Sequence, residues 1–249
     1  MKTEWDYTNL AKAYLKRPSY SADAIESMIK ITQLGSSHSV CDVGAGVAHL
    51  TMDLNKYFGS IKAVEPNDAM RELGANRTIN LKNISWSEGT GEDTRMPSNT
   101  FDMVTFGSSF NVCNQSEALA ETSRILKSKG WFACMWNHRI LSDPIQSKIE
   151  TIIKENIPNF DYGKRREDQT EVIKNSSHFS KIIKLEGDVT HSQSKADIVE
   201  AWSSHASLER QAGDKFESII NMISKYLDEL NSSEIVVPYK TLIWLAQSN

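Results

Sequence analysis

Residues 42–48 of this 249-residue chain read DVGAGVA, a glycine-rich turn from which the rest of the fold can be inferred. Its first two residues end a predicted strand, residues 39–43, and its last residue begins a predicted helix, residues 48–57. Glycines at such a turn allow positive φ angles and let the backbone approach a ligand closely. The helix N-terminus adds unpaired N–H groups and the positive end of a dipole. The turn therefore predicts a site for a pyrophosphate or for the carboxylate of an amino-acid-like cofactor.

Outward from this turn, strand-like and helix-like segments alternate. Further strands are predicted at residues 61–64, 84–86, 101–106 and 131–136. Helices are predicted from Ala69 and over residues 116–126, the second closed by the Lys127–Gly130 segment. Such alternation favours an α/β fold with a mostly parallel sheet and helices on both faces.

The alternation becomes less regular after Trp136. Helices are expected over residues 144–155, 195–208 and 214–230, and strands near residues 182–189 and 234–245. Pro238 interrupts the last strand and is expected at a bulge or at a sheet edge. Without a linker or a repeat, a single domain, residues 1–249, is the simplest interpretation.

Within that domain, four parts are expected. They are an N-terminal helical lid (1–36), a cofactor-binding core (37–140), substrate-facing helices (141–180 and 190–232) and the last strands (181–189 and 234–247).

Composition excludes some functions. The net charge of −4 gives no broad basic surface for nucleic acid. No apolar run reaches the ~20 residues of a membrane span, and residues 1–14 do not resemble a signal peptide. Three widely spaced cysteines without a CxxC pair fit a reducing compartment. We expect a cytoplasmic, soluble monomer or homodimer that acts on a small molecule, with no nucleic acid, membrane or metal partner.

Two cofactor classes compete for the glycine turn. A dinucleotide site requires G-x-G-x-x-G/A, but here His49 stands where that pattern has its last glycine or alanine. Glu65 ends the second strand about 20 residues after the glycines, where a carboxylate can accept the hydroxyls of a ribose. Glu65 fits both classes, so a nicotinamide-dependent oxidoreductase remains an alternative at this point.

Several motifs together resemble a known family. They are Asp42-x-Gly44-x-Gly46, Val64-Glu65-Pro66-Asn67-x-x-Met70, Gly89-Thr90-Gly91-Glu92-Asp93 with Met96-Pro97, residues 101–105, Arg124-Ile125-Leu126-Lys127-x-x-Gly130 and Trp136-Asn137-x-Arg139. The pattern resembles class I S-adenosylmethionine-dependent methyltransferases. It is most similar to their small-molecule branch, which includes methyltransferase type 11 and trans-aconitate methyltransferase-like enzymes.

The resemblance implies a fold, a cofactor and site residues. The implied fold is a Rossmann-like, seven-stranded, mostly parallel sheet with an antiparallel C-terminal strand and a substrate-facing insertion. The cofactor would be S-adenosyl-L-methionine, and the product S-adenosyl-L-homocysteine. Residues at the turn would hold the methionine part, Glu65 the ribose, and the loop after the third strand the adenine. The implied cofactor-binding residues are Asp42, Gly44, Ala45, Gly46, Glu65, Pro66, Met70, Thr90, Gly91, Glu92, Phe106 and Gly107.

Two departures affect the expected mechanism. The turn continues with Val47 and Ala48 instead of a third glycine, and Asn111 stands where a histidine is common in this family. An asparagine can position a substrate but cannot act as a base at neutral pH. His138, just after the fifth strand, is the alternative catalytic candidate. An anionic acceptor would need no base.

The acceptor is expected to meet cationic and aromatic side chains. Arg165 or Arg166 would clamp a carboxylate or phosphoryl group, and Arg139 is a second clamp candidate. Trp5 and Tyr7 could join an aromatic lid with other N-terminal residues. The predicted substrate-binding residues are Tyr14, Arg17, Tyr20, Asn111, Arg139, Arg165 and Arg166.

These observations predict methyl transfer to a small, anionic acceptor by an in-line displacement that depends on alignment. The alternatives are the nicotinamide-dependent oxidoreductase and a non-catalytic cofactor-binding module.

Overall fold

A computed structural model describes residues 11–249, without the side chains of Lys12, Ala13 and Ala206. Trp5 and Tyr7, which were expected in an aromatic lid, lie outside the described residues. The described part of the expected N-terminal lid holds two helices, α1 (Ala11–Tyr14) and α2 (Ala22–Thr32).

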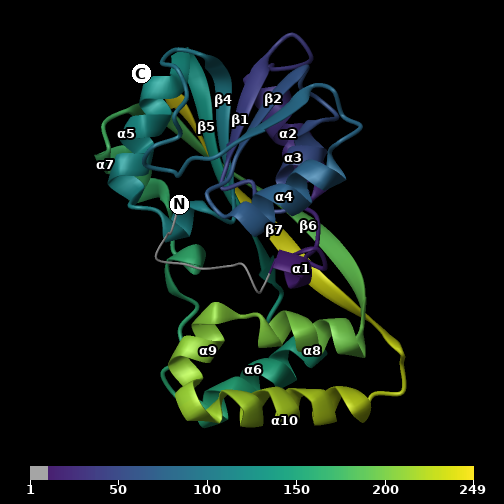
Figure 1. Cartoon of the computed structure of the whole chain (residues 1–249). Coiled ribbons are helices and arrows are strands. Elements are labelled where there is room, and N and C mark those ends of the chain that lie inside the picture. Colours follow the sequence, from purple (N-terminus) through teal and green to yellow (C-terminus); the bar gives the residue numbers. More distant parts are fainter. Residues whose placement is uncertain (1–10) are drawn as a thin grey trace.

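A seven-stranded sheet forms the centre of the molecule, in the order β3-β2-β1-β4-β5-β7-β6 (Figure 1). Strands β1 to β5 pair in parallel, whereas β7 is antiparallel to both of its neighbours. The strands are β1 (Ser39–Val43), β2 (Ser60–Val64), β3 (Ile84–Ser87), β4 (Phe101–Gly107), β5 (Leu126–Arg139), β6 (Phe179–Ser194) and β7 (Glu234–Ser248). The predicted fold class, a mostly parallel sheet with an antiparallel C-terminal strand, is confirmed.

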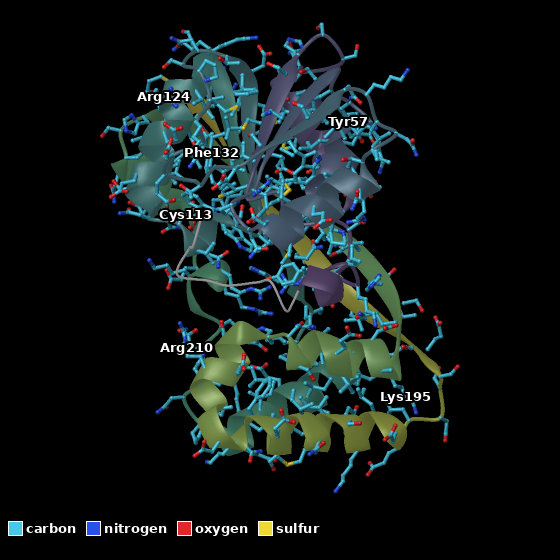
Figure 2. The ribbon with its side chains drawn as sticks, viewed as in Figure 1. Tyr57, Cys113, Arg124, Phe132, Lys195 and Arg210 are labelled. Atoms are coloured by element: carbon cyan, nitrogen blue, oxygen red, sulfur yellow. The ribbon has the colours of Figure 1, made fainter. Side chains whose placement is uncertain are left out.

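Helices cover both faces of the sheet, as the alternating pattern predicted. Apolar residues of α2 and α3 (His49–Leu54) pack on one face, beside α4 (Asp68–Arg77). Those of α5 (Gln115–Ile125) and α7 (Thr170–Asn175) pack on the other. Figure 2 shows Phe132 inside this layer and Cys113 at its margin toward the remaining helices.

A helical cap lies below the sheet in Figure 1. It consists of α6 (Pro144–Asn156), α8 (Lys195–Ser203), α9 (Ala206–Ala212) and α10 (Phe216–Asp228). These helices share an apolar core with the N-terminal part of β7, and this core includes Ile149, Trp202 and Ile223. The cap comes from the two segments, residues 141–180 and 190–232, that were predicted as substrate-facing helices, but α7 of the first segment packs on the sheet instead.

Helix boundaries follow side-chain caps where the sequence offers them. Asn67 accepts a hydrogen bond from the Met70 backbone N–H (3.0 Å) at the start of α4. Asp143 accepts from Ile145 and Gln146 at the start of α6, where Pro144 occupies the first turn. Among residues 11–249, no helix is long and apolar enough to cross a membrane.

Two local predictions need correction. Helix α5 ends at Ile125, and the Lys127–Gly130 segment, predicted to close it, belongs to β5. Pro238 is not on an edge strand, because β7 lies between β5 and β6. However, β5 pairs with β7 only as far as Tyr239, so Pro238 lies just beyond that ladder and its missing N–H breaks no pair there.

Candidate functional site

A cavity of about 540 Å³ lies between the carboxyl ends of the parallel strands and the cap. This volume is in the range of small-molecule sites. The cavity collects most of the residues predicted from the sequence. It is lined by Tyr14, Arg17, Tyr20, Asp42, Gly44, Ala45, Gly46, Glu65, Pro66, Met70, Thr90, Gly91, Glu92, Gly107, Arg139, Arg165 and Arg166. Phe106, Asn111 and His138 do not line it.

The glycine turn adopts the backbone conformation that its composition predicts. Gly44 and Gly46 have φ angles of 66° and 55°, in the left-handed region that favours glycine. A Cβ atom at Gly44 would lie 2.4 Å from Cβ of Ser109, whereas one at Gly46 would meet nothing within 4 Å. Ala48, in the part of the turn that lacks the family's third glycine, also has a left-handed backbone, with φ of 72°. The turn thus keeps its shape without that glycine.

Asp42 is fully buried at the end of β1, where the turn begins. Its carboxylate accepts hydrogen bonds from the hydroxyls of Thr51 (2.6 Å) and Thr105 (2.9 Å). Burial raises the pKa of Asp42 from 3.8 to about 6, although the two hydroxyls act in the opposite direction. The folded chain therefore holds a buried negative charge at neutral pH, and a cation in the cavity would stabilise it.

This pKa gives a prediction for stability. Because the folded-state pKa of Asp42 lies above its unfolded value, its contribution is complete below about pH 4 and is lost as the pH rises through 6. A rise of about two pKa units corresponds to a loss of about 3 kcal/mol in the free energy of unfolding. Asparagine does not titrate, so the free energy of unfolding of Asp42→Asn should not fall in this way. Relative to wild type, its stability should therefore rise by about 3 kcal/mol between pH 4 and pH 7.5. Urea unfolding of both proteins without ligand checks this, and an equal difference at both pH values would refute it.

Glu65 lies at the end of β2 and is 7% exposed. One carboxylate oxygen accepts the backbone N–H of Gly46 (2.9 Å), and the other accepts that of Asn67 (2.8 Å). Burial raises the pKa of Glu65, and the two backbone donors oppose this rise. Glu65 therefore ties the glycine turn to the start of α4 and keeps a carboxylate at the cavity wall.

The loop after β3 forms the next part of the wall. Thr90 closes it with a backbone N–H that donates to the carbonyl of Asp93 (2.8 Å). Glu92 accepts the backbone N–H of Asn114 (2.7 Å), so its carboxylate connects this loop to the start of α5. A Cβ atom at Gly91 would lie 2.5 Å from the Cys113 sulfur, so a side chain there would require the Cys113 thiol to move.

Four arginines line the opposite side of the cavity. Arg17 follows α1, Arg139 ends β5, and Arg165 and Arg166 lie in a short 3-10 helix, Gly163–Arg166. Within residues 11–249, none of them forms an ion pair with a carboxylate. Burial, with help from Arg17 and Arg139, lowers the pKa of Arg165 to about 10.

Several of these guanidinium groups stack on aromatic rings. Arg17 lies 3.5 Å from the ring centre of Tyr14, and Arg166 lies 4.4 Å from that of Tyr162. Arg139 lies 4.3 Å from the ring centre of Trp202. Stacking on a ring orients a guanidinium without neutralising it. The cations therefore stay available to an anion in the cavity.

Three predicted residues lie elsewhere. The amide oxygen of Asn111 accepts the indole N–H of Trp136 (2.8 Å), and Phe106 is buried among the aromatic rings of the sheet layer. His138 donates from Nε2 to the carbonyl of Arg165 (2.8 Å), and burial lowers its pKa to about 4. The structure therefore does not place Asn111 or His138 at the cavity, and His138 holds the backbone of an arginine that lines it.

An N-terminal strap, residues 14–20, crosses from the sheet layer to the cap. His49 donates from Nε2 to the carbonyl of Tyr14 (2.7 Å), and Lys16 pairs with Asp197 of α8 (2.7 Å). Tyr20 and Ser108 share a hydrogen bond of 3.0 Å at the other end. The strap thus closes one side of the cavity and brings Tyr14, Arg17 and Tyr20 into its wall.

Sequence reasoning missed other residues of the wall. Ser108, Ser109 and Asn137 line the cavity at the carboxyl ends of β4 and β5. The rule that ligands bind at the carboxyl ends of parallel strands could have identified them. His49 and His205 also line the cavity. His205 carries no sequence signal, because it reaches the site only through the packing of the cap.

Comparisons with known proteins agree with this geometry. A family model described as "Methyltransferase domain" matches residues 41–134. A ubiquinone/menaquinone biosynthesis C-methyltransferase of Zymomonas mobilis is 27% identical over 178 residues, covering 66% of this chain and 72% of that protein. Other curated relatives match over less than half of their own length.

Solved structures share the fold. The YcgJ protein of Bacillus subtilis aligns with a TM-score of 0.58 at 17% identity, covering 91% of this chain and 98% of that one. Phosphoethanolamine N-methyltransferase 2 of Haemonchus contortus, in complex with phosphomonomethylethanolamine and S-adenosylhomocysteine, aligns with a TM-score of 0.56 at 13% identity. That alignment covers 97% of this chain and 57% of the other.

Proposed function

Because this chain is a class I S-adenosylmethionine-dependent methyltransferase, we propose that it methylates a small anionic acceptor, either a carboxylate or a phosphorylated metabolite. This membership replaces the two alternatives considered from the sequence, the nicotinamide-dependent oxidoreductase and the non-catalytic module.

The sheet side of the cavity fits the cofactor. A Cβ atom at Gly46 would meet nothing within 4 Å, and Gly46 lines the cavity, so the backbone there is open to a ligand. Asp42 offers a buried carboxylate to the cationic methionine end, and Glu65 offers one to the ribose hydroxyls. Ala45, Pro66, Met70, Thr90, Gly91, Glu92 and Gly107 complete the proposed cofactor site.

Charge is separated across the cavity. Among residues 11–249, the carboxylates that line it are those of Asp42, Glu65 and Glu92, and they belong to the sheet side. The four arginines, which form no ion pair within the same residues, lie on the strap, the end of β5 and the 3-10 helix, and they face the other side. A cationic cofactor and an anionic acceptor would each meet the opposite charge. We therefore place the acceptor among Arg17, Arg139, Arg165 and Arg166.

The expected chemistry needs alignment more than proton transfer. Bound S-adenosylmethionine supplies an electrophilic methyl group. The arginines would hold the acceptor in one orientation, while the strap and the cap exclude water. A carboxylate oxygen is already a nucleophile and needs no general base. This agrees with the positions of Asn111 and His138, since neither presents a base to the cavity.

A binding experiment tests the acceptor class. The protein saturated with S-adenosylhomocysteine is titrated calorimetrically with citrate and with pyrophosphate, which separates a preference for carboxylates from one for phosphoryl groups. We expect Arg165→Gln to weaken binding of the preferred anion by about 10- to 150-fold, because a charge-assisted hydrogen bond contributes about 1.5–3 kcal/mol.

The neighbouring Lys164 provides a matched control, because it carries the same charge but is exposed and does not line the cavity. Lys164→Gln should change the affinity by no more than about twofold, the effect of a screened surface charge. Equal losses in the two variants, or no binding of either anion to wild type, would contradict an anionic acceptor.

A further inference from the structure

His205 is a buried residue of the cavity wall that the proposed function does not use. It lies between α8 and α9 and is 6% exposed. Its ring stacks on that of Trp202, with centres 5.3 Å apart and planes at 25°, and it also contacts the ring of Tyr162 at 6.0 Å. The ring is therefore held in one orientation by the packing of the cap.

The hydrogen bonds of His205 fix its tautomer. Nδ1 accepts the backbone N–H of Leu208 (3.2 Å) and thereby caps α9. A neutral imidazole that accepts at Nδ1 must carry its proton at Nε2. Burial, followed by the charges of Arg165, Arg139 and Arg17, holds the pKa of His205 well below its usual value, so the ring stays neutral. Nε2 is thus an N–H donor and not a base.

This donor has no acceptor within residues 11–249. Nε2 of His205 is buried without a hydrogen-bond partner, and so is the indole N–H of the stacked Trp202. The charged groups that most affect His205 are the guanidinium groups of Arg165, Arg139 and Arg17, which are also donors. A buried N–H without a partner costs about 1–3 kcal/mol. Only an acceptor atom, such as an oxygen of an anion, can satisfy this set of groups.

We propose that the Nε2–H of His205 and the arginines beside it form an oxyanion subsite at the cap end of the cavity. In this subsite His205 donates a hydrogen bond to one carboxylate or phosphoryl oxygen of the acceptor. The inference rests on the proposed function, because it places the same anion. It assigns His205 to binding and selection of the acceptor, and it gives this histidine no part in proton transfer.

Two substitutions separate the two ring nitrogens. Asparagine can replace Nδ1 as the cap of α9 but cannot reach the position of Nε2, whereas glutamine can place an N–H near Nε2 but is a poor cap. With citrate and pyrophosphate as probes on the S-adenosylhomocysteine complex, we expect His205→Asn to weaken binding of the preferred anion by about 10-fold or more. His205→Gln should stay within about threefold of wild type while its melting temperature falls.

Affinity for S-adenosylhomocysteine, which depends on the other side of the cavity, shows that both variants are folded. Long-range ¹H–¹⁵N NMR of wild type should show the proton of His205 on Nε2. The inference is overturned if that proton is on Nδ1, or if His205→Asn binds the anion as wild type does while Arg165→Gln does not. The latter result would leave the proposed function intact. Failure of wild type to bind either anion would overturn both.

Discussion

Glu65→Gln is expected to lower the affinity for S-adenosylhomocysteine by about 100-fold. The carboxylate of Glu65 accepts the backbone N–H groups of Gly46 and Asn67 on its two oxygens and would also accept the ribose hydroxyls. A glutamine has a single oxygen, so its NH₂ group would face one of these donors. Losing charge-assisted hydrogen bonds worth about 1.5–3 kcal/mol each gives a reduction of this size. Isothermal titration measures it directly.

Glu72→Gln is the matched control for this change. Glu72 is an exposed residue of α4, the helix that begins just after Glu65, and it does not line the cavity. The same loss of charge there should leave the affinity within about twofold of wild type, because exposed charges are screened. If both variants bound the nucleoside as wild type does, Glu65 would have no contact with the cofactor.

Gly44→Ala is expected to destabilise the fold much more than Gly46→Ala. Both glycines have positive φ, so each alanine would carry a conformational cost of about 1 kcal/mol. At Gly46 the new Cβ would meet nothing within 4 Å. At Gly44 it would lie 2.4 Å from Cβ of Ser109, whose hydroxyl donates to the carbonyl of Val43 (2.6 Å). Forcing this contact apart adds about 1–3 kcal/mol.

Urea unfolding should therefore give losses of about 3 kcal/mol for Gly44→Ala and about 1 kcal/mol for Gly46→Ala. The first variant should also lose most of its affinity for S-adenosylhomocysteine, since the turn must move away from Ser109. Equal losses of stability in the two variants would show that Ser109 yields easily and that the turn is not tightly packed.

The sheet side of the site could be predicted from the sequence because its determinants are local. Gly44 and Gly46 follow a strand directly, and Glu65 ends the next strand, so strand-end positions alone bring them together. Asn67 and Asp143 mark helix starts for the same local reason. These features depend on a few neighbouring residues and on the topology of a parallel sheet.

The cap side could be predicted only in part. Arg139, Arg165 and Arg166 were candidates by charge, but no local pattern shows that they lie with Arg17 on the same side of the cavity. His205 reaches the wall through the packing of α8 and α9, which depends on contacts distant in sequence.

The misplaced predictions have similar causes. Asn111 follows β4 as expected, whereas His138, expected just after the fifth strand, lies within β5. The side chain of Asn111 is hydrogen-bonded to Trp136, and that of His138 to the carbonyl of Arg165. The error at Pro238 arose because the sequence does not reveal that the C-terminal strand inserts between two others.

If the cavity holds S-adenosylmethionine on its sheet side, the wild-type chain should bind S-adenosylhomocysteine there. Isothermal titration with S-adenosylhomocysteine, and separately with NAD, measures this. We expect binding of the nucleoside with a micromolar Kd, an affinity of about −8 kcal/mol, and no detectable binding of NAD. Absence of binding to S-adenosylhomocysteine, or binding of NAD in its place, would contradict the assignment of Asp42, the glycine turn and Glu65 to this cofactor.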